Sequence, residues 1–393
     1  MLSHTIVSRA VLARNFAVCA NAAVNVKALT IEKTKNPKPH LPKEKLVFGK
    51  TFTDHMLEMD HHDTKGWSTP KITPYHPIPC DPAMSVFHYG MECFEGMKAY
   101  LDADNHVRLF RPLENMKRMN TSMVRMALGP IDPEATVELI KKFVLLEKSW
   151  IPQGRGYSLY LRPTAIATDA GLGVHASHTS KFFVIASPVG PYYSTGFKPV
   201  KLVADEINRR SWPGGVGFCK CGGNYAPTVY VAEEWAKKGF SNILWLGPNK
   251  TITEGGAMNL FFFWKNEQGE KELITAPLNG MILPGITRKS IIELTKKWGE
   301  FKVTEREYTM DEIVKASNEK RLLECFMCGT AAVVGSVNCV HYQGVDYNIP
   351  LDPKDASKPA GPVTQRLFDT MTGIQLGLVE NPYPEDPWSI RID

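Results

Sequence analysis

Cysteines are few and stand far apart in this chain, with eight among 393 residues. So sparse a set does not make a disulfide scaffold, and in a reducing compartment it stays as free thiols. Two pairs, Cys219-x-Cys221 and Cys325-x-x-Cys328, would together offer four thiolates to a zinc ion. The first pair lacks the spacer of two to four residues that structural zinc sites use, so free thiols are the favoured interpretation.

Acidic residues are missing before Glu32, and no long uninterrupted apolar run occurs there either. Arg9 and Arg14 interrupt the apolar stretch, which excludes a membrane span and a secretory signal core. An arginine-bearing, acid-free start is typical of a mitochondrial transit peptide, predicted here for residues 1–25, with a disordered tail as the alternative. Residues 26–45, rich in Lys and Pro, predict a flexible linker. We therefore expect the mitochondrial matrix, with the cytoplasm as the alternative.

A strong charge of one sign is also missing from the body of the chain. The net charge of +5 comes from residues 1–50, which hold nine Lys and Arg against Glu32 and Glu44, so the remainder carries −2. No basic surface for a nucleic acid is indicated. A hydrophobic content of 43% and a charged content of 22% describe a globular protein long enough for two domains. We expect small-molecule partners, and neither a nucleic acid nor a membrane.

Strand and helix patterns alternate along the chain, with a break rich in proline and glycine near its middle. Before the break, Pro112 opens an amphipathic helix whose methionines recur near helical spacing and are interpreted as core packing. The break, Pro188–Gly196, predicts a domain boundary. The sequence therefore predicts a mixed α/β protein with a small α/β domain over 46–190, a linker over 191–199 and a larger α/β domain over 200–393.

One lysine, Lys220, stands between the glycine pairs Gly214-Gly215 and Gly222-Gly223. Glycine lets the backbone pass close to a bulky ligand because it has no Cβ. A lysine shielded from water is partly neutral, and the neutral amine is the form that attacks carbonyl groups. A solvated lysine in a glycine-rich turn is the alternative, and the rest of the chain has to decide between them.

Two further segments offer groups to a phosphorylated ligand. Glu254 ends a predicted strand and precedes two glycines. One interpretation is a carboxylate that lies beside a ligand, and the alternative is a glutamate that starts an ordinary hairpin turn. Gly285, Ile286 and Thr287 place N–H groups and a hydroxyl at a helix N-terminus, which favours phosphate, although a plain helix start has the same pattern. A lysine amine, a carboxylate and phosphate-binding turns are the set that pyridoxal phosphate requires.

A strand and a turn add candidate substrate contacts. Tyr160 and Arg162 face one side of the predicted strand Ser158–Pro163, because side chains in a strand alternate. The pair forms either a structural hydrogen bond at a sheet edge or a grip on a carboxylate. Thr330 and Ala331 follow a strand-like segment, in a turn whose N–H groups are available to an anion.

Several motifs, taken in order, resemble those of branched-chain amino acid aminotransferases, in the fold-type IV group of pyridoxal phosphate enzymes. They are Leu46–Met56, Phe94–Lys98, Arg111-Pro112 with Asn115-Met116, Gly222–Tyr225 and Leu283–Arg288. The resemblance runs from about Leu46 to the carboxyl end and implies a homodimer with pyridoxal 5'-phosphate as cofactor. It implies transfer of the amino group of leucine, isoleucine or valine to 2-oxoglutarate, which gives branched-chain 2-keto acids and glutamate.

The resemblance also implies roles residue by residue. Lys220 matches the lysine that forms the Schiff base, Glu254 the glutamate on the pyridine nitrogen, and Tyr225 the tyrosine on the ring hydroxyl. The positions that match the phosphate site are Arg118, Gly285, Ile286, Thr287 and Thr330. Those that match the substrate site are the aromatic pocket of Phe48, Tyr89, Phe94, Tyr160 and Tyr192, then Arg162 for the second carboxylate of glutamate, and Ala257 and Ala331 for the α-carboxylate.

The chain departs from the family in two features. Ala257 stands where mitochondrial members usually carry a threonine, whose hydroxyl helps to hold the substrate carboxylate. Ala332 and Gly335 stand where mammalian mitochondrial members carry a redox Cys-x-x-Cys, and Cys325 and Cys328 lie upstream of that position. Thiol regulation of that kind is therefore not expected to carry over.

Two alternatives remain open on the sequence. A D-amino acid aminotransferase or an aminodeoxychorismate lyase would share the fold, but these enzymes lack the match from Phe48 to Met56. A non-catalytic binding protein that kept the fold is the alternative from another class, and the presence of both Lys220 and Glu254 argues against it.

Overall fold

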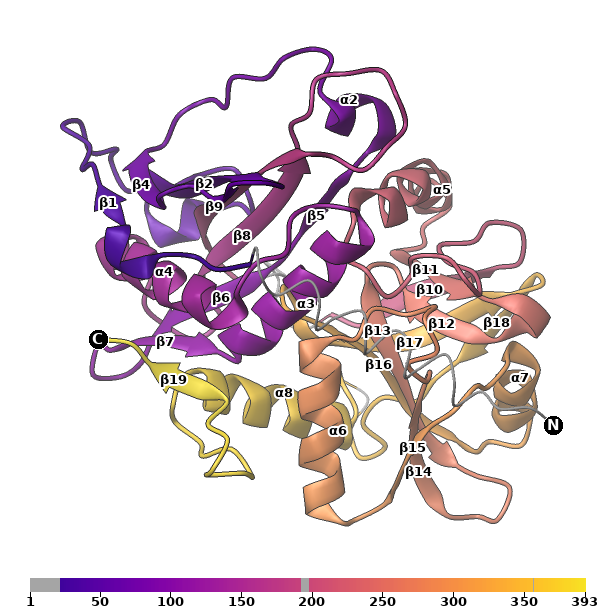
Figure 1. Cartoon of the computed structure of the whole chain (residues 1–393). Coiled ribbons are helices and arrows are strands. Elements are labelled where there is room, and N and C mark those ends of the chain that lie inside the picture. The colour runs from indigo at the N-terminus through magenta and orange to yellow at the C-terminus, as the bar shows by residue number, and fades with distance from the viewer. Residues whose placement is uncertain (1–21, 192–197, 356) are drawn as a thin grey trace.

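The computed structural model of the chain describes residues 22–191, 198–355 and 357–393. These residues form two β-sheets that lie side by side, the first built mainly from the N-terminal half and the second from the C-terminal half (Figure 1). Helices pack on both sheets, so the predicted mixed α/β class is confirmed. Most of the predicted transit peptide (1–25) and of the linker at 191–199 falls outside the described residues.

The first sheet has ten strands among the described residues, in the order β1-β4-β2-β9-β8-β6-β7-β19, with β3 beside β2 and β5 beside β8. Leu159 and Leu161 of β8 share a core with the buried methionines of α3, which confirms the packing predicted for them. Alternation along β8 therefore puts Tyr160 and Arg162 on the opposite face. The elements are β1 Thr30–Ile31, β2 His55–His62, β3 Gly66–Trp67, β4 Lys71–Pro74, α2 Ser85–Tyr89, β5 Glu92–Phe94, β6 Met97–Leu101, β7 Val107–Phe110, α3 Pro112–Arg125, α4 Pro133–Leu146, β8 Ser158–Ala167, β9 Thr179–Val189 and β19 Ser389–Arg391.

The second sheet has nine strands within the described ranges, in the order β12-β11-β10-β17-β16-β13-β14-β15, with β18 beside β17. Ile313 of α7 packs in one core of this sheet, and Ile291 of α6 packs with Leu367 of α8 in another. None of the described helices is both long and apolar enough to cross a membrane. The elements are β10 Val200–Asp205, α5 Ala226–Ala236, β11 Asn242–Leu246, β12 Ile252–Gly255, β13 Met258–Lys265, β14 Lys271–Thr275, α6 Ile286–Trp298, β15 Lys302–Glu305, α7 Met310–Asn318, β16 Leu322–Gly329, β17 Val333–Tyr342, β18 Val345–Asn348 and α8 Pro362–Gln375.

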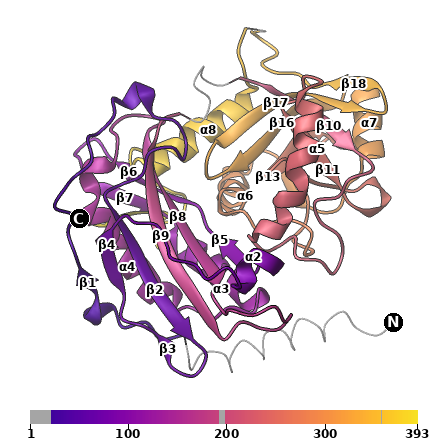
Figure 2. The ribbon, with the colours of Figure 1, turned by 90° about the horizontal axis from the view of Figure 1, so that it is seen from above.

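Both ends of the described chain belong to the first sheet, which corrects two predicted boundaries. β19, near the C-terminus, pairs antiparallel with β7, although the larger domain was expected to run to residue 393. Within the predicted flexible linker at 26–45, β1 pairs with β4, and Val26 and Leu29 pack against the core of the first sheet. A few apolar residues anchor this segment to the core. The Lys- and Pro-rich composition of the segment as a whole predicts a flexible linker, so these contacts were not expected. α8 contacts β16, β17 and β7, and so lies between the two halves (Figure 2).

The stretch around Lys220 also ties the halves together. Cys219 and Cys221 are buried in the core of the first sheet, although the chain has already entered its second half. Cys325 and Cys328 lie in two other hydrophobic clusters. The two cysteine pairs therefore do not come together as zinc ligands, and all four residues are free thiols, as favoured from the sequence.

Candidate active site

Lys220 lies where the two halves meet, and groups of the first half fix its backbone. Its N–H donates to Ser122 Oγ of α3 at 3.0 Å, and its carbonyl accepts from the N–H of Phe94 at 2.9 Å. The Lys220 amine lies 4.7 Å from the centre of the Phe94 ring. The segment that the sequence singled out for its glycines is thus held against the Phe94–Lys98 motif.

The amine of Lys220 lies in an aromatic environment with little water. Its Nζ donates to Tyr225 Oη at 3.0 Å. Burial, together with the nearby charge of Arg118, lowers the pKa of Lys220 to about 8. Burial raises the pKa of Tyr225 to about 12, so its phenol stays neutral near pH 7. An amine with such a pKa is partly neutral near neutral pH, which is the condition for attack on a carbonyl.

Glu254 lies next to the end of β12, with its carboxylate buried and bound on both oxygens. Its Oε2 pairs with Arg210 Nε at 2.9 Å, while Oε1 accepts from Asn259 Nδ2 at 3.0 Å and from the N–H of Leu283 at 2.9 Å. Arg210 also donates to the carbonyl of Gly217, at 3.5 Å, and so links Glu254 to the lysine stretch. These donors fix the position of one negative charge in the buried junction.

Arg118 is brought to the start of α6. Its Nε and Nη2 donate to the buried carboxylate of Glu95 at 2.6 and 2.9 Å, and its Nη1 donates to the carbonyl of Pro284 at 3.0 Å. Gly285 is the N-cap of α6 and offers no side-chain cap, so the first N–H groups of the helix are available to an anion. Arg118 thus lies beside the start of the segment Gly285–Thr287.

Two turns lie at one end of β13, because Asn259 pairs with Glu254 on one side and with Cys328 on the other. The turn between β12 and β13 carries Ala257, which is exposed, and the turn between β16 and β17 carries Thr330 and Ala331. Val333, directly after the second turn, has a φ of +63°. This left-handed conformation is strained for a β-branched residue, and such strain concentrates at functional sites.

Aromatic rings and one arginine gather beside Phe94. Tyr160 Oη accepts from Arg162 Nη2 at 3.2 Å, and the Phe48 ring packs edge-on against Tyr160 at 4.8 Å. The guanidinium of Arg162 stacks 4.7 Å from the Phe94 ring, and its buried Nε has no hydrogen-bond partner among the described residues. A Cβ on Gly96 would lie 2.1 Å from Tyr160 Oη, so only glycine leaves room for this tyrosine.

One predicted residue, Tyr89, is not brought into this group in the described structure. The hydroxyl of Tyr89 donates to the carbonyl of Leu172 on the β8–β9 loop, and no contact of the described residues joins it to Lys220. Tyr192 falls outside the described residues. Conversely, the sequence reasoning missed Arg210 and Glu95, whose partners are distant in sequence. The only signal available for Arg210 was an arginine pair shortly before the lysine stretch.

Known proteins share this sequence over most of its length. Residues 92–340 match the family described as amino-transferase class IV. The chain is 53% identical to the branched-chain-amino-acid aminotransferase of Dictyostelium discoideum, over 94% of this chain and 96% of that one. It is 49% identical to the mitochondrial enzyme of that name from Schizosaccharomyces pombe, over 92% of this chain and 84% of that one. It is 46% identical to the cytosolic enzyme of that name from Saccharomyces cerevisiae, over 91% of this chain and 95% of that one.

Solved structures share the fold. A T.th. branched-chain amino acid aminotransferase, solved with pyridoxamine 5'-phosphate, aligns with a TM-score of 0.68 at 26% identity, over 87% of this chain and all of that one. The branched-chain amino acid aminotransferase of Thermobaculum terrenum, in its PLP form, aligns with a TM-score of 0.67 at 19% identity, over 86% of this chain and 98% of that one. At that identity the likeness supports the fold alone. The predicted fold-type IV architecture is confirmed. The chain therefore belongs to the branched-chain amino acid aminotransferases, which are class IV, pyridoxal phosphate-dependent enzymes.

Proposed function

We propose that Lys220 holds pyridoxal 5'-phosphate covalently in this enzyme, which moves the amino group of leucine, isoleucine or valine to 2-oxoglutarate. One observation carries this assignment: a buried lysine amine with a pKa of about 8 in contact with Tyr225 Oη, at a junction that also holds the carboxylate of Glu254 and the uncapped start of α6. An amine, a fixed carboxylate and a phosphate-binding helix start are what this cofactor needs.

The donor set fits the cofactor group by group. The carboxylate of Glu254 suits a protonated pyridine nitrogen, because a charge-assisted hydrogen bond is stronger than a neutral one. Tyr225, which already contacts Lys220, suits the ring hydroxyl. The phosphate would lie on the helix start and the second turn, with the residues Arg118, Gly285, Ile286, Thr287 and Thr330.

Side chains of this protein account for the proton transfers and for the stabilisation of charge. When bound, pyridoxal phosphate accepts the electrons released at the substrate Cα. With the cofactor bound, Lys220 would act as the general base that takes the Cα proton and as the acid that returns it. Its pKa of about 8 keeps both protonation states accessible near neutral pH. Glu254, fixed by three donors, stabilises the positive charge on the ring nitrogen.

Substrates are amino acids and 2-keto acids. The rings of Phe48, Phe94 and Tyr160 offer apolar walls, where each added methylene contributes roughly 1–3 kcal/mol and favours branched side chains over that of alanine. Arg162, with an unpartnered buried Nε in the described structure, suits the second carboxylate of glutamate. The N–H of Ala331 suits the α-carboxylate.

One spectrum and one assay test this function. The purified protein should show the absorption band of bound pyridoxal phosphate, and leucine should change that band. With 2-oxoglutarate present, glutamate should form. A protein that shows no such band and forms no glutamate from leucine would contradict the proposal.

We also propose that the enzyme works as a homodimer. Large apolar side chains are exposed on α2 and on the β8–β9 loop, where Phe87 is 59%, Leu172 is 71% and Val174 is 82% exposed. An apolar surface of this kind is typical of a protein interface. Light scattering of the purified protein should give twice the mass of one chain, and the mass of a single chain would contradict the dimer.

For the compartment we propose the mitochondrial matrix. The acid-free N-terminus supports this proposal. The relatives include enzymes named mitochondrial and enzymes named cytosolic, and so leave the cytoplasm as the alternative. Fractionation of cells that express the tagged full chain separates the two compartments.

A further inference from the structure

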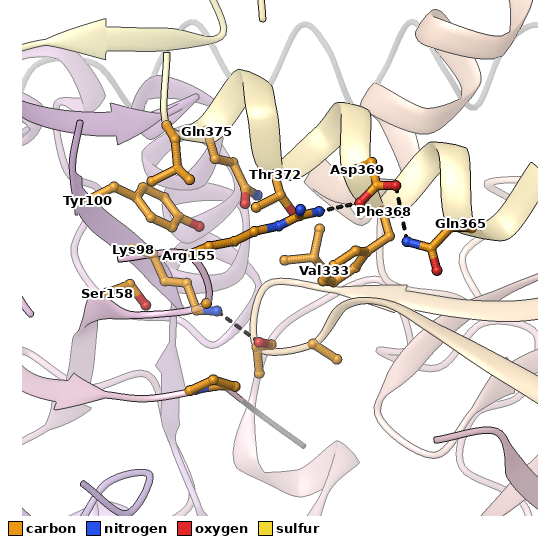
Figure 3. Close-up of a pocket in the computed structure, with 15 residues that line it drawn as sticks. Lys98, Tyr100, Arg155, Ser158, Val333, Gln365, Phe368, Asp369, Thr372 and Gln375 are labelled. Carbon is orange, nitrogen blue, oxygen red and sulfur yellow. Dashed lines mark hydrogen bonds and ion pairs between the residues drawn. The ribbon is translucent and has the colours of Figure 1, made fainter. Parts of the chain in front are cut away.

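A second buried lysine, Lys98, lines a cavity beside the Lys220 centre. The cavity has a volume of about 370 Å³ and lies between β6 and β8 of the first half and α8 with the start of β17 in the second half (Figure 3). Such a volume is at the lower end of the range of roughly 300–1,000 Å³ in which proteins hold small molecules. Of the residues assigned above to cofactor and substrate, only Ala331 lines it.

The amine of Lys98 is buried in this cavity without a counter-ion. The residue is 7% exposed, and its Nζ donates one hydrogen bond, to the carbonyl of Ala331 at 2.8 Å. No carboxylate of the described residues pairs with it, and burial alone lowers the pKa of Lys98 to about 8. The amine is therefore mostly charged at pH 7. A buried charge without a partner is costly, and two of its N–H donors remain available to an anion.

Two buried hydroxyls of the cavity are unsatisfied as well. Ser158 Oγ and Thr372 Oγ1 have no hydrogen-bond partner among the described residues. Ser158 shares a sheet face with Lys98, because Lys98 pairs with Tyr160 across β6 and β8 and alternate residues face the same way. Thr372 comes from α8 on the opposite wall (Figure 3). Buried hydroxyls nearly always find a partner, so both are available to a polar ligand in the cavity.

The other residues that line the cavity favour a ligand with a single negative charge. Arg155 already pairs with Asp369, and both side chains are about half exposed. Lys98 is thus the single unpaired cation of the described lining. The other walls are mainly apolar, with Val333, Phe368 and Leu376, to which Tyr100 and Gln375 add a phenol and an amide. One cation, a few neutral polar groups and mainly apolar walls suit one carboxylate on a short apolar chain better than a phosphate or a dicarboxylate.

We propose that this cavity is a second ligand site, which binds a small apolar monocarboxylate with its charge on Lys98 and Ser158 and its chain against Tyr100 and Phe368. Branched 2-keto acids belong to this chemical class. Because Lys98 also holds the carbonyl of Ala331, a ligand in the cavity acts on the turn between β16 and β17. That effect on turnover rests on the role proposed for Ala331, whereas the binding itself does not.

4-Methylpentanoate, the leucine skeleton without its amine, tests this site by titration calorimetry on the holoenzyme. We expect two molecules per wild-type chain, one at the Lys220 centre and one in the cavity. Lys98→Met keeps the length of the side chain without its charge and should bind one. The matched control, Lys65→Met, removes an exposed lysine and should still bind two.

Ser158→Ala keeps the test decisive if Lys98→Met does not fold. Its hydroxyl has no partner in the described structure, so its removal leaves the fold intact, but affinity in the cavity should fall about fivefold or more. One molecule per wild-type chain, two in Lys98→Met, or unchanged affinity in Ser158→Ala would overturn the proposal. Leucine turnover of the same preparations tests the proposed function separately.

Discussion

Two buried lysines of this enzyme have amines of the same acidity in different surroundings. Burial lowers the pKa of both Lys220 and Lys98 to about 8. The amine of Lys220 contacts a tyrosine hydroxyl, and the charge of Arg118 contributes to its shift. The amine of Lys98 contacts one backbone carbonyl in a cavity with unpartnered hydroxyls. A lowered lysine pKa therefore does not identify a catalytic centre, and the neighbouring groups do.

The difference has its origin in the fold. Lys98 lies within the regular strand β6, and the one hydrogen bond of its amine goes to the carbonyl of Ala331, on the turn between β16 and β17. Lys220 lies on an irregular segment that crosses from one half to the other and is bound there by Ser122 and Phe94. This segment places the Lys220 amine beside the Tyr225 hydroxyl, the Phe94 ring and the charge of Arg118, whereas the Lys98 amine contacts a single backbone carbonyl.

The largest expected effect separates the two lysines by activity. Lys220→Ala should lower leucine turnover by on the order of 10³-fold or more, because cofactor attachment and proton transfer are both lost. Lys98→Met removes one hydrogen bond to the Ala331 carbonyl and should keep turnover within about tenfold. Steady-state kinetics of both variants measure this, and equal losses would mean that the two sites do not differ in the way described.

A comparable pair of buried glutamates sharpens the contrast. Glu254→Gln should lower turnover by on the order of 10²–10³-fold while the cofactor stays bound, because a neutral amide does not stabilise the charged ring nitrogen. Glu324 accepts instead from Val363 N–H and from the N–H and hydroxyl of Thr364. Glu324→Gln should cost about 1–3 kcal/mol of stability and leave turnover unchanged. Near-normal turnover in Glu254→Gln would make Glu254 structural.

The pH dependence of the free energy of unfolding tests the pKa of Lys98 and not that of Lys220, because the amine of Lys220 is bound to the cofactor in the holoenzyme. An unfolded lysine has a pKa near 10.4. Between about pH 8 and 10.4 the unfolded chain binds the extra proton, so stability should rise with pH in that window as the cost of the buried charge disappears. Lys98→Met should be more stable than wild type at pH 7 by on the order of 2 kcal/mol, with the gain shrinking towards pH 10.4. Urea midpoints measure it, and a pH-independent difference would contradict the shifted pKa of Lys98.

The smallest expected effect concerns the exposed turn near Lys220. Ala257→Thr should lower the Michaelis constant for leucine about two- to tenfold, if the added hydroxyl supplies one hydrogen bond to the substrate carboxylate. If the alanine instead makes room for larger substrates, threonine should leave leucine unchanged and weaken methionine and phenylalanine. Kinetics with the three amino acids decide between these outcomes. No change with any of them would mean that position 257 does not touch the substrate.

Local patterns made much of the Lys220 centre predictable. A lone lysine between glycines, a glutamate before glycines and a helix start each occupy a few adjacent residues, and the structure brings Lys220, Tyr225 and the start of α6 to one junction with Glu254. The strands and the methionine packing of α3 also follow from periodicity.

The rest depends on contacts between segments far apart in the chain. Arg210 becomes informative only through Glu254, which lies in β12, beyond α5 and β11. Neither segment alone contains a sequence pattern that predicts the pairing of β19 with β7. Lys98 belonged to a recognised motif, but its cavity is closed by α8 near the C-terminus, so no local pattern would indicate it.

The central claim is that Lys220, and not the equally acidic Lys98, carries the cofactor. Borohydride reduction of the holoenzyme fixes pyridoxal phosphate to the amine that holds it, and peptide mapping then locates the pyridoxyl group. We expect it on the peptide that contains Lys220, between Cys219 and Cys221. A pyridoxyl group on Lys98, or on any lysine other than Lys220, would contradict the account.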